Sequence, residues 1–422
     1  MFNGLQISDR RERWLVGAAD AVLTAGEALL RPFARRRAPA VPPRRILLLR
    51  LERIGDLLMA WPAIAAVRHL APQARIDLVV GSWNEAIARL IDAVDRVRTL
   101  DANWLSRGAP AHGLTGLIRH ARTWRTDEYD LAINFEGDIR SHLLMACSGA
   151  PRRVGFDMAG GGPLLTDRVA YDPSCHVADN LLHLVAHALD VPGQPLPRIE
   201  PRLKVPIDAR EAARKLLAGE GGDGRPPAGP LIGIQVGSGR QVKQWDPTRF
   251  GDLGAALARK HGARLAFTGS AEDRPLVELA LARLPKGIDV IDLCGRLDLP
   301  TLAAVLEGLS VFITGDTGPM HLAAAVGAPL VAIFGPSDPR RWGPLSSGAQ
   351  IVHSEVPCRP CNRIRRPPSH CVGTVPECLA AIGVGDVLQA VDRLLAGTGN
   401  GSAAAPPAVP GEIAAEVTDG RR

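Results

Sequence analysis

The segment Leu-Arg-Leu-Glu-Arg-Ile-Gly-Asp-Leu-Leu at residues 49–58 combines residue types that could carry chemistry. It follows an apolar run, and Gly55 allows the chain to turn sharply out of a strand. Asp56 then stands at the start of a predicted helix, where a carboxylate can accept a proton from an incoming hydroxyl group. Aspartate is also a favoured helix cap, so the pattern alone leaves a structural role open.

A second segment, Gly-Ser-Gly-Arg-Gln-Val-Lys-Gln-Trp at 237–245, lies between a predicted strand and a predicted helix. The backbone N–H groups of the loop around Ser238 and the ammonium group of Lys243 together suit a diphosphate. The segment lacks the Gly-Lys-Ser/Thr ending of a Walker motif. A flexible surface turn is the alternative interpretation.

The third segment, Gly-Asp-Thr-Gly-Pro-Met-His at 315–321, also joins a predicted strand to a predicted helix. We expect Asp316 to cap the helix, and Thr317 and Gly318 to present N–H groups to an anion. His321 follows one turn later and can reach the same anion. Taken alone, this histidine is equally consistent with a structural role, whereas the whole heptapeptide is much more specific.

A fourth loop, Gly-Ser-Ala-Glu-Asp at 269–273, follows the predicted strand that ends at Thr268. An acidic residue at a strand end of a nucleotide-binding domain often hydrogen-bonds ribose hydroxyl groups, and either Glu272 or Asp273 could do so. A solvated helix start is the alternative.

Four cysteines close to the C-terminus form the pattern Cys358-x2-Cys361-x9-Cys371-x6-Cys378. One Cys-x2-Cys pair suits a metal, but the second pair is too widely spaced to indicate zinc strongly. The pattern therefore leaves open whether the cysteines bind a structural zinc ion, form disulfides or remain free thiols. In each case we expect a structural role on a loop rather than a catalytic one. We expect no catalytic metal and no cofactor, because no Asp-x-Asp pair of the metal-binding kind stands at a strand end.

These segments fall at the junctions of two strand–helix alternations, which predict two doubly wound α/β domains facing a central cleft, the GT-B architecture. The predicted strands are 46–51, 76–80, 94–100, 131–135 and 153–156, then 231–236, 263–268, 290–292, 311–314 and 330–334. The predicted organisation is a helix and Pro-rich linker (1–43), an N-terminal domain (44–195), an interdomain region (196–229), a C-terminal domain (230–395) and a disordered tail (396–422).

The positive charge of the chain is concentrated at its N-terminus. The 422 residues carry a formal net charge of +6, and residues 1–50 alone hold ten Arg against four acidic residues. The remainder is neutral overall, and aromatic residues make up only 4%. A general nucleic-acid-binding surface is therefore not indicated.

Residues 11–37 predict one amphipathic helix that ends in Arg35, Arg36 and Arg37. Its apolar stripe consists of Trp14, Ala18, Val22, Ala25, Leu29 and Phe33. Such a helix can lie on an anionic membrane surface or pack on the domain behind it. The sequence offers no plausible signal peptide and no transmembrane segment. We therefore expect a cytoplasmic protein, in peripheral contact with the inner face of the cytoplasmic membrane if the helix binds lipid.

Over residues 45–395 these motifs resemble glycosyltransferase family nine, the ADP-heptose:lipopolysaccharide heptosyltransferases. The resemblance is carried by Ile-Gly-Asp-Leu-Leu with Trp61-Pro62, Gly-Ser followed by Lys243-Gln-Trp245, the Gly269 loop, Gly-Asp-Thr-Gly-Pro-Met-His, and Phe334-Gly-Pro. It implies an inverting, metal-independent transfer of heptose from an ADP-sugar to a lipopolysaccharide core acceptor.

The resemblance also implies roles for individual residues. Asp56 matches the general base of the family, and the donor-binding residues would be Ser238, Lys243, Asp273, Asp316, Thr317, Gly318 and His321. Three competing interpretations remain: a family member with a different nucleotide sugar or lipid-linked acceptor, a non-catalytic nucleotide-binding scaffold, and a nucleotide-sugar epimerase. Release of free nucleotide only in the presence of an acceptor would distinguish a transferase from the latter two.

Overall fold

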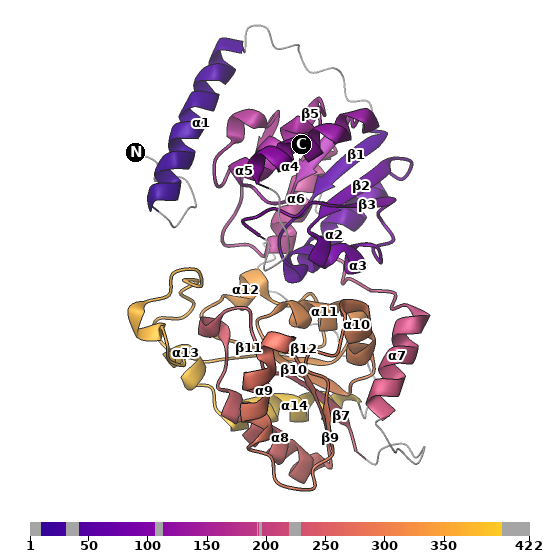
Figure 1. Cartoon of the computed structure of the whole chain (residues 1–422), viewed down its shortest axis with the longest axis vertical. Helices are drawn as coiled ribbons and strands as arrows, with labels where there is room; N and C mark the ends of the chain where they lie inside the picture. Colours follow the sequence, from indigo (N-terminus) through magenta and orange to yellow (C-terminus); the bar gives the residue numbers. More distant parts are fainter. Residues whose placement is uncertain are drawn as a thin grey trace, which may run out of the picture.

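The computed structural model describes residues 10–30, 42–105, 113–191, 193, 196–218 and 229–398. It contains two α/β domains stacked along the long axis of the molecule, each built on a six-stranded sheet (Figure 1). The strand orders are β3-β2-β1-β4-β5-β6 and β12-β11-β10-β7-β8-β9, and every pairing is parallel. Both orders reverse beside the first strand of the domain, so each sheet has the switch point at which such folds bind ligands. The predicted fold class is confirmed.

In the N-terminal domain, the apolar strand β1 is buried because helices cover both faces of the parallel sheet. The strands are β1 (Arg45–Leu49), β2 (Arg75–Val80), β3 (Arg96–Thr99), β4 (Leu131–Asn134), β5 (Arg152–Phe156) and β6 (Asp167–Val169). The helices are α1 (Arg10–Leu30), α2 (Ile54–Leu70), α3 (Glu85–Ala88), α4 (Leu114–Thr123), α5 (Ile139–Cys147) and α6 (Val177–Ala188), and η4 (Gly162–Leu164) is a 3-10 turn.

The C-terminal domain repeats the arrangement, and α7, which precedes its first strand, packs on α10. The strands are β7 (Leu231–Gln235), β8 (Arg264–Thr268), β9 (Val290–Asp292), β10 (Val311–Gly315), β11 (Leu330–Phe334) and β12 (Ala349–His353). The helices are α7 (Ile207–Ala218), α8 (Pro247–His261), α9 (Arg274–Leu281), α10 (Leu299–Glu307), α11 (Gly318–Val326), α12 (Pro339–Trp342), α13 (Glu377–Ala380) and α14 (Val384–Thr398).

The sequence pattern missed α5, β6 and β12. The first is a nine-residue helix started by Asp138, whose side chain accepts hydrogen bonds from Arg140 N and Ser141 N. The strands β6 and β12 each pair with a single neighbouring strand, so they lack the continuous apolar run of a central strand. At the C-terminus, α14 continues to Thr398, so the predicted start of a disordered tail at 396 is wrong by three residues. Residues 399–422 lie outside the described residues.

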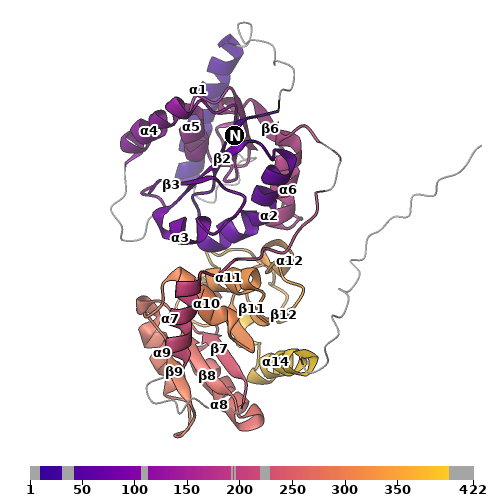
Figure 2. The same ribbon diagram turned by 90° about the vertical axis from the view of Figure 1, so that its right-hand side faces the viewer.

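The two domains meet where the carboxyl ends of their sheets face each other. Figure 2 shows α2 and α3 on one side of this boundary and α10 and α11 on the other. Gly318 approaches Ile54 so closely that a Cβ at Gly318 would lie 2.5 Å from Cγ2 of Ile54. A hydrogen bond 3.1 Å long joins Nε2 of His176 to the carbonyl oxygen of Gly343 across the same boundary.

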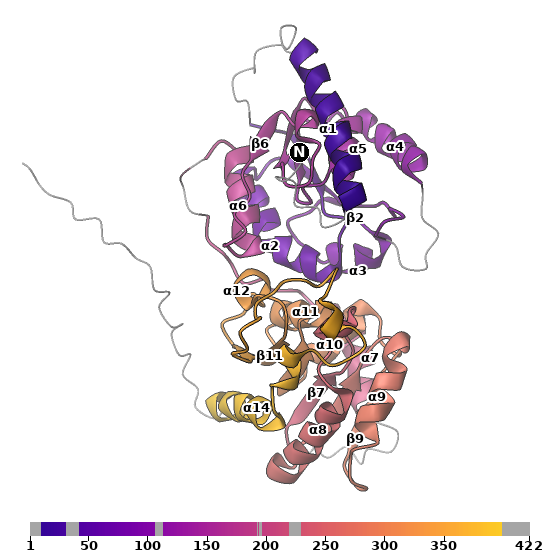
Figure 3. The same cartoon turned by 90° about the vertical axis from the view of Figure 1, so that its left-hand side faces the viewer.

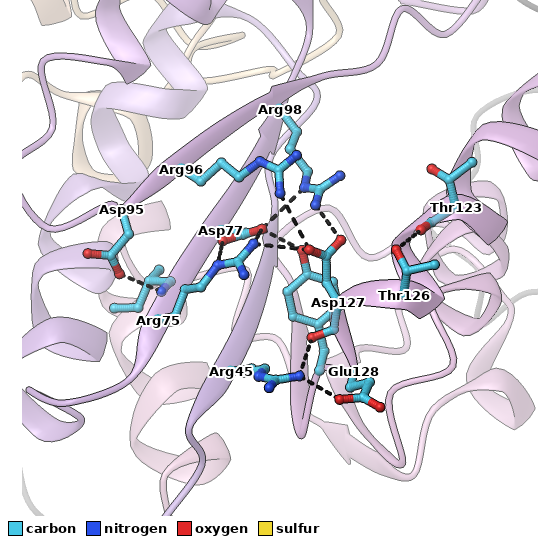
Figure 4. A network of polar contacts seen from close by, with 12 residues as sticks. Arg45, Arg75, Asp77, Asp95, Arg96, Arg98, Thr123, Thr126, Asp127 and Glu128 are labelled. Atoms are coloured by element: carbon cyan, nitrogen blue, oxygen red, sulfur yellow. Dashed lines mark hydrogen bonds and ion pairs between the residues drawn. The ribbon is translucent and has the colours of Figure 1, made fainter.

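A buried carboxylate fixes the outer strands of the N-terminal sheet (Figure 4). Asp77 on β2 accepts hydrogen bonds from Arg75, Arg98 and the hydroxyl of Tyr129, which lies 2.6 Å away. Burial alone would raise the pKa of Asp77, but these hydrogen bonds outweigh burial and lower it. Asp127 extends the network because it also binds Arg75 and Arg98. The charges are therefore paired, as burial of a carboxylate requires.

The helix α1 packs on the N-terminal domain, one of the two arrangements that the sequence left open, and the contact is made by Asp20 and Val16 rather than by the apolar stripe. Oδ1 of Asp20 accepts a hydrogen bond of 2.7 Å from the N–H of Gly161, and Val16 lies against Gly160. Trp14 and Val22 of the predicted apolar stripe are 63% and 73% exposed. In the part of the chain that the structure describes, no helix is long and apolar enough to span a bilayer.

Candidate active site

Asp56 lies in the first turn of α2, at the domain boundary. Its Oδ2 accepts a hydrogen bond of 3.2 Å from the N–H of Arg53, the N-cap residue of α2. Its Oδ1 faces the guanidinium of Arg50 at 3.5 Å, and the side chain is 25% exposed. The structural role that the sequence left open is thus real. The hydrogen bond from Arg53 occupies Oδ2 of Asp56, and Oδ1 remains accessible beside the guanidinium of Arg50.

Sequence reasoning missed Arg50 and Glu136, two buried residues beside Asp56. Nη1 of Arg50 lies 3.5 Å from Oε2 of Glu136, and Oε1 of Glu136 accepts hydrogen bonds from the N–H groups of Leu51 and Glu52. Burial raises the pKa of Glu136, and the nearby carboxylates of Glu52 and Asp56 raise it further against the opposing effect of Arg50. An arginine that ends the apolar run of β1 and a glutamate just after β4 were the available signals.

Lys243 and Asp316, which the sequence predicted to bind the same ligand, form an ion pair in the structure. Nζ of Lys243 lies 2.7 Å from Oδ2 of Asp316, and their side chains are 18% and 9% exposed. Lys243 ends the 3-10 turn η5 (Gln241–Lys243), and Asp316 directly follows β10. The ion pair therefore holds the second and third motifs together at the carboxyl edge of the sheet.

The first turn of α11 offers N–H groups to an anion. Thr317 is the N-cap residue, and Pro319 stands in the first turn. Oγ1 of Thr317 lies 3.0 Å from Oγ1 of Thr314, and among the described residues no side chain caps this helix. The first N–H groups of α11 therefore have no side-chain cap, and they directly follow Asp316, the ion-pair partner of Lys243, so this helix start could accept an anion.

His321 connects the two halves of the site. Burial lowers the pKa of His321 to about 4, although the carboxylates of Asp316 and Asp56 oppose this effect. Its ring lies against Gly55, because a Cβ at Gly55 would be 2.8 Å from Cδ2. At neutral pH the imidazole is therefore uncharged, and it serves as a hydrogen-bonding group rather than as a cation.

Ser238 and Asp273 lie on two adjacent loops at the carboxyl edge of the sheet. A Cβ at Gly237 would be 1.9 Å from Oδ1 of Asp273, so the loop around Ser238 rests directly on this carboxylate. Oδ2 of Asp273 accepts hydrogen bonds from the N–H and the hydroxyl of Ser270, at 2.8 and 2.9 Å. Asp273 is therefore a capping residue of η6 (Ala271–Asp273), and its contact with a ribose stays a prediction.

The four clustered cysteines lie on and beside the loop between β12 and α13, which we call the cysteine loop (residues 354–376). The structure describes all four as free thiols, and within the described ranges no group of three or more His, Cys, Asp or Glu is arranged to hold a metal ion. Burial, followed by the three neighbouring thiols, raises the pKa of Cys378 to about 11. Nη2 of Arg365 on this loop lies 3.8 Å from Oε1 of Glu52, across the domain boundary.

Two doubly wound domains that meet at the carboxyl ends of their parallel sheets are the architecture of the two-domain sugar transferases. Residues 117–371 match the model of glycosyltransferase family 9 (heptosyltransferase). This match covers more than half of the chain, and the chain belongs to this family. It is a glycosyltransferase.

Relatives of known name cover most of the chain. It is 30% identical over 318 residues to lipooligosaccharide heptosyltransferase 2 of Campylobacter jejuni, which covers 75% of this chain and 89% of that protein. It is 26% identical over 330 residues to lipopolysaccharide heptosyltransferase 1 of Pseudomonas aeruginosa, with coverage of 75% and 86%.

Solved structures show the same fold. ADP-heptose lipopolysaccharide heptosyltransferase II of Escherichia coli superimposes with a TM-score of 0.69 at 21% identity, covering 84% of this chain and all of that chain. The family 9 glycosyltransferase of Veillonella parvula gives a TM-score of 0.71 at 22% identity, covering 86% of this chain and all of that chain.

Proposed function

We propose that the protein transfers a heptose from ADP-heptose to a lipopolysaccharide core acceptor, by an inverting mechanism that needs no metal. The observation that carries this proposal is the contact between Gly55 and His321. It brings the carboxylate that follows Gly55 to the same point of the domain boundary as the anion site at the start of α11. The names of the relatives in Campylobacter and Pseudomonas supply the heptose and the class of acceptor.

The diphosphate of the donor binds in the C-terminal domain. Lys243 and the uncapped N–H groups of α11 compensate its charge, and Ser238 contributes to the loop beside them. The carboxylate of Asp316 keeps Lys243 in place before the donor arrives. These groups offset part of the negative charge of the diphosphate, and we expect the transfer to need no divalent cation.

The acceptor hydroxyl binds beside Asp56 in the N-terminal domain. Its oxygen attacks the anomeric carbon while the bond from that carbon to the diphosphate breaks, and the electron pair of this bond leaves with the diphosphate. The hydroxyl proton passes to Oδ1 of Asp56, the oxygen that does not accept the hydrogen bond from Arg53. The base lies in the N-terminal domain and the diphosphate site in the C-terminal domain. We infer that the acceptor attacks from the side opposite the leaving group, and such a displacement inverts the anomeric configuration.

Donor turnover across a panel of ADP-, GDP- and UDP-sugars, with and without a heptose-deficient core acceptor, tests the proposal. We expect nucleotide release from ADP-heptose only when the acceptor is present, and at the same rate with EDTA. Release from another nucleotide sugar in preference to ADP-heptose would reassign the donor. A loss of turnover in EDTA that magnesium or manganese restores would refute the metal-independent mechanism. Binding without release for every pair would favour a non-catalytic scaffold.

A further inference from the structure

Exposed apolar side chains gather on one flank of the molecule. Nine large apolar side chains are exposed in the part of the chain that the structure describes, and five of them lie on α1 and the cysteine loop. These five are Trp14, Leu15, Val22, Val372 and Val375. Figures 1 and 3 show that α1 and the cysteine loop, in gold, lie on the same flank, α1 on the N-terminal domain and the loop on the C-terminal domain.

The packing of α1 turns its apolar side outward. The inner side is fixed by Asp20, by Val16 and by the buried Gly17. The loop that receives it contains Gly160 and Gly161, whose φ angles of 82° and 83° suit glycine. A Cβ at Gly160 would lie 2.6 Å from Cγ1 of Val16, so this glycine allows the helix to approach closely. An amphipathic helix normally buries its apolar side. Here the contact of Asp20 and Val16 with the N-terminal domain lies on the opposite side of the helix, so the apolar side remains available to another surface.

The same flank is positively charged. The cysteine loop contains four arginines and one glutamate, and Arg363, Arg365 and Arg366 among them are exposed. On α1, Arg11 is exposed close to the apolar side chains. Apolar side chains bordered by arginine are the combination that binds at the interface of an anionic bilayer, where apolar groups enter the headgroup region and guanidinium groups meet lipid phosphates.

We propose that this flank, formed by the outer side of α1 and the cysteine loop, docks the enzyme on an anionic lipid bilayer. This inference rests on the proposed function in one respect, because an acceptor linked to lipid is confined to a membrane surface. The flank includes segments of both domains, so docking holds the domain boundary, with Asp56 and Lys243, at the edge of the bilayer. The loop reaches that boundary directly through the contact of Arg365 with Glu52.

A second copy of the chain is a poorer occupant of this flank. A symmetric dimer through the flank would pair this positively charged surface with an identical copy of itself. The exposed arginines of the loop would then meet arginines, and like charges at an interface are unfavourable. An anionic bilayer instead provides both an apolar layer and a complementary charge.

Binding to vesicles tests the proposal with the full-length chain. Two single variants, Val22→Asp on α1 and Val372→Asp on the cysteine loop, place a carboxylate on the flank. The matched control is Ile207→Asp on α7, because Ile207 is 75% exposed, as against 73% for Val22, and α7 lies on the opposite side of the molecule (Figure 1). The measurement is sedimentation with vesicles of phosphatidylcholine containing phosphatidylglycerol, compared with vesicles of phosphatidylcholine alone.

We expect the parent chain and Ile207→Asp to bind the anionic vesicles, and high salt to weaken this binding. Each flank variant should bind about tenfold more weakly or worse, because it loses an apolar contact and gains a repelled charge. Turnover on a soluble, delipidated acceptor should remain the same in all four proteins. This second readout separates the two proposals, since a wrong assignment of the reaction would abolish turnover in the parent chain as well.

Three results would overturn the inference. One is equal vesicle binding by the parent chain and both flank variants. Another is equal weakening by Ile207→Asp, which would make the effect one of net charge. The last is a parent chain that does not bind vesicles and whose sedimentation coefficient differs from that of the flank variants. This result would identify a protein–protein interface. Circular dichroism checks folding, and Val372→Asp keeps the test valid if Val22→Asp loosens α1.

Discussion

The imidazole of His321 lies directly against the backbone of Gly55, so that a methyl group at Gly55 would stand 2.8 Å from Cδ2 and 3.5 Å from Nε2. The two residues belong to different domains and to the two motifs that the sequence assigned to base and donor. Glycine is therefore required here for close approach between two helices rather than for a special backbone angle. The contact sets the distance between the halves of the candidate site.

Gly55→Ala should lower turnover roughly 10- to 100-fold, because His321 must shift and reacting groups lose their alignment. The unfolding midpoint should change little, since alanine favours the helix α2 over glycine and offsets part of the steric cost. The matched control is Gly385→Ala in α14, where an added Cβ meets nothing within 4 Å. Unchanged turnover in Gly55→Ala would show that the close contact does not govern alignment.

Asp56→Asn should lower turnover by about two to four orders of magnitude while donor affinity changes little. The amide oxygen of asparagine can still accept the hydrogen bond from the N–H of Arg53, so the start of α2 should persist. Asp298→Asn at the N-cap of α10 provides the same exchange at another helix start, outside the proposed base and donor residues, and should leave turnover unchanged. Steady-state kinetics and donor titration measure both effects. A normal rate in Asp56→Asn would leave Asp56 as a capping residue only.

Lys243→Ala should weaken ADP binding roughly 10- to 100-fold, because the diphosphate loses a charged hydrogen bond and meets the unpaired carboxylate of Asp316. Adenosine should bind almost as before, since it has no phosphate. Lys260→Ala removes a lysine from another ion pair of 2.7 Å, with Asp392, and is the control for loss of charge. Calorimetry compares the three proteins. Equal losses for ADP and adenosine would contradict the assignment.

The strand–helix junctions were predictable because their signals are local. An apolar run, a glycine-rich turn and a helix start appear in order at Gly55, Ser238 and Asp316, and parallel sheets bring such turns to one edge. Other features depend on tertiary contacts between segments far apart in the sequence. The ion pair of Arg50 with Glu136 connects the segments that follow β1 and β4, and the hydrogen bond of Arg50 to the carbonyl of Phe135 spans 85 residues of the chain.

The side of α1 that meets the domain could not be predicted, for a similar reason. The periodicity of Trp14 and Val22 shows that the helix has an apolar side, but it contains no information about which side meets the domain. That choice is made by Asp20 and by the glycine pair Gly160–Gly161, which is 140 residues away and offers an N–H group instead of an apolar groove. The hydrogen bond from Gly161 to Asp20 therefore places the polar side of α1 against the domain and leaves the apolar side exposed.

The buried imidazole of His321 should make the stability of the protein depend on pH. Its pKa is about 4 in the folded protein and 6.5 ordinarily, so between these values the unfolded chain binds a proton that the folded chain does not. Its contribution is therefore complete above pH 6.5 and is lost as the pH falls from 6.5 toward 4, by on the order of 3 kcal/mol in total. Urea unfolding at pH 7.5, 6 and 5 measures this loss.

His321→Gln should be less stable at pH 7.5, but its free energy of unfolding should depend less steeply on pH. His69→Gln, at an exposed position of α2, should keep the pH dependence of the parent chain. If His321→Gln retains the full slope, other groups cause the acid sensitivity and the imidazole is not held neutral by burial.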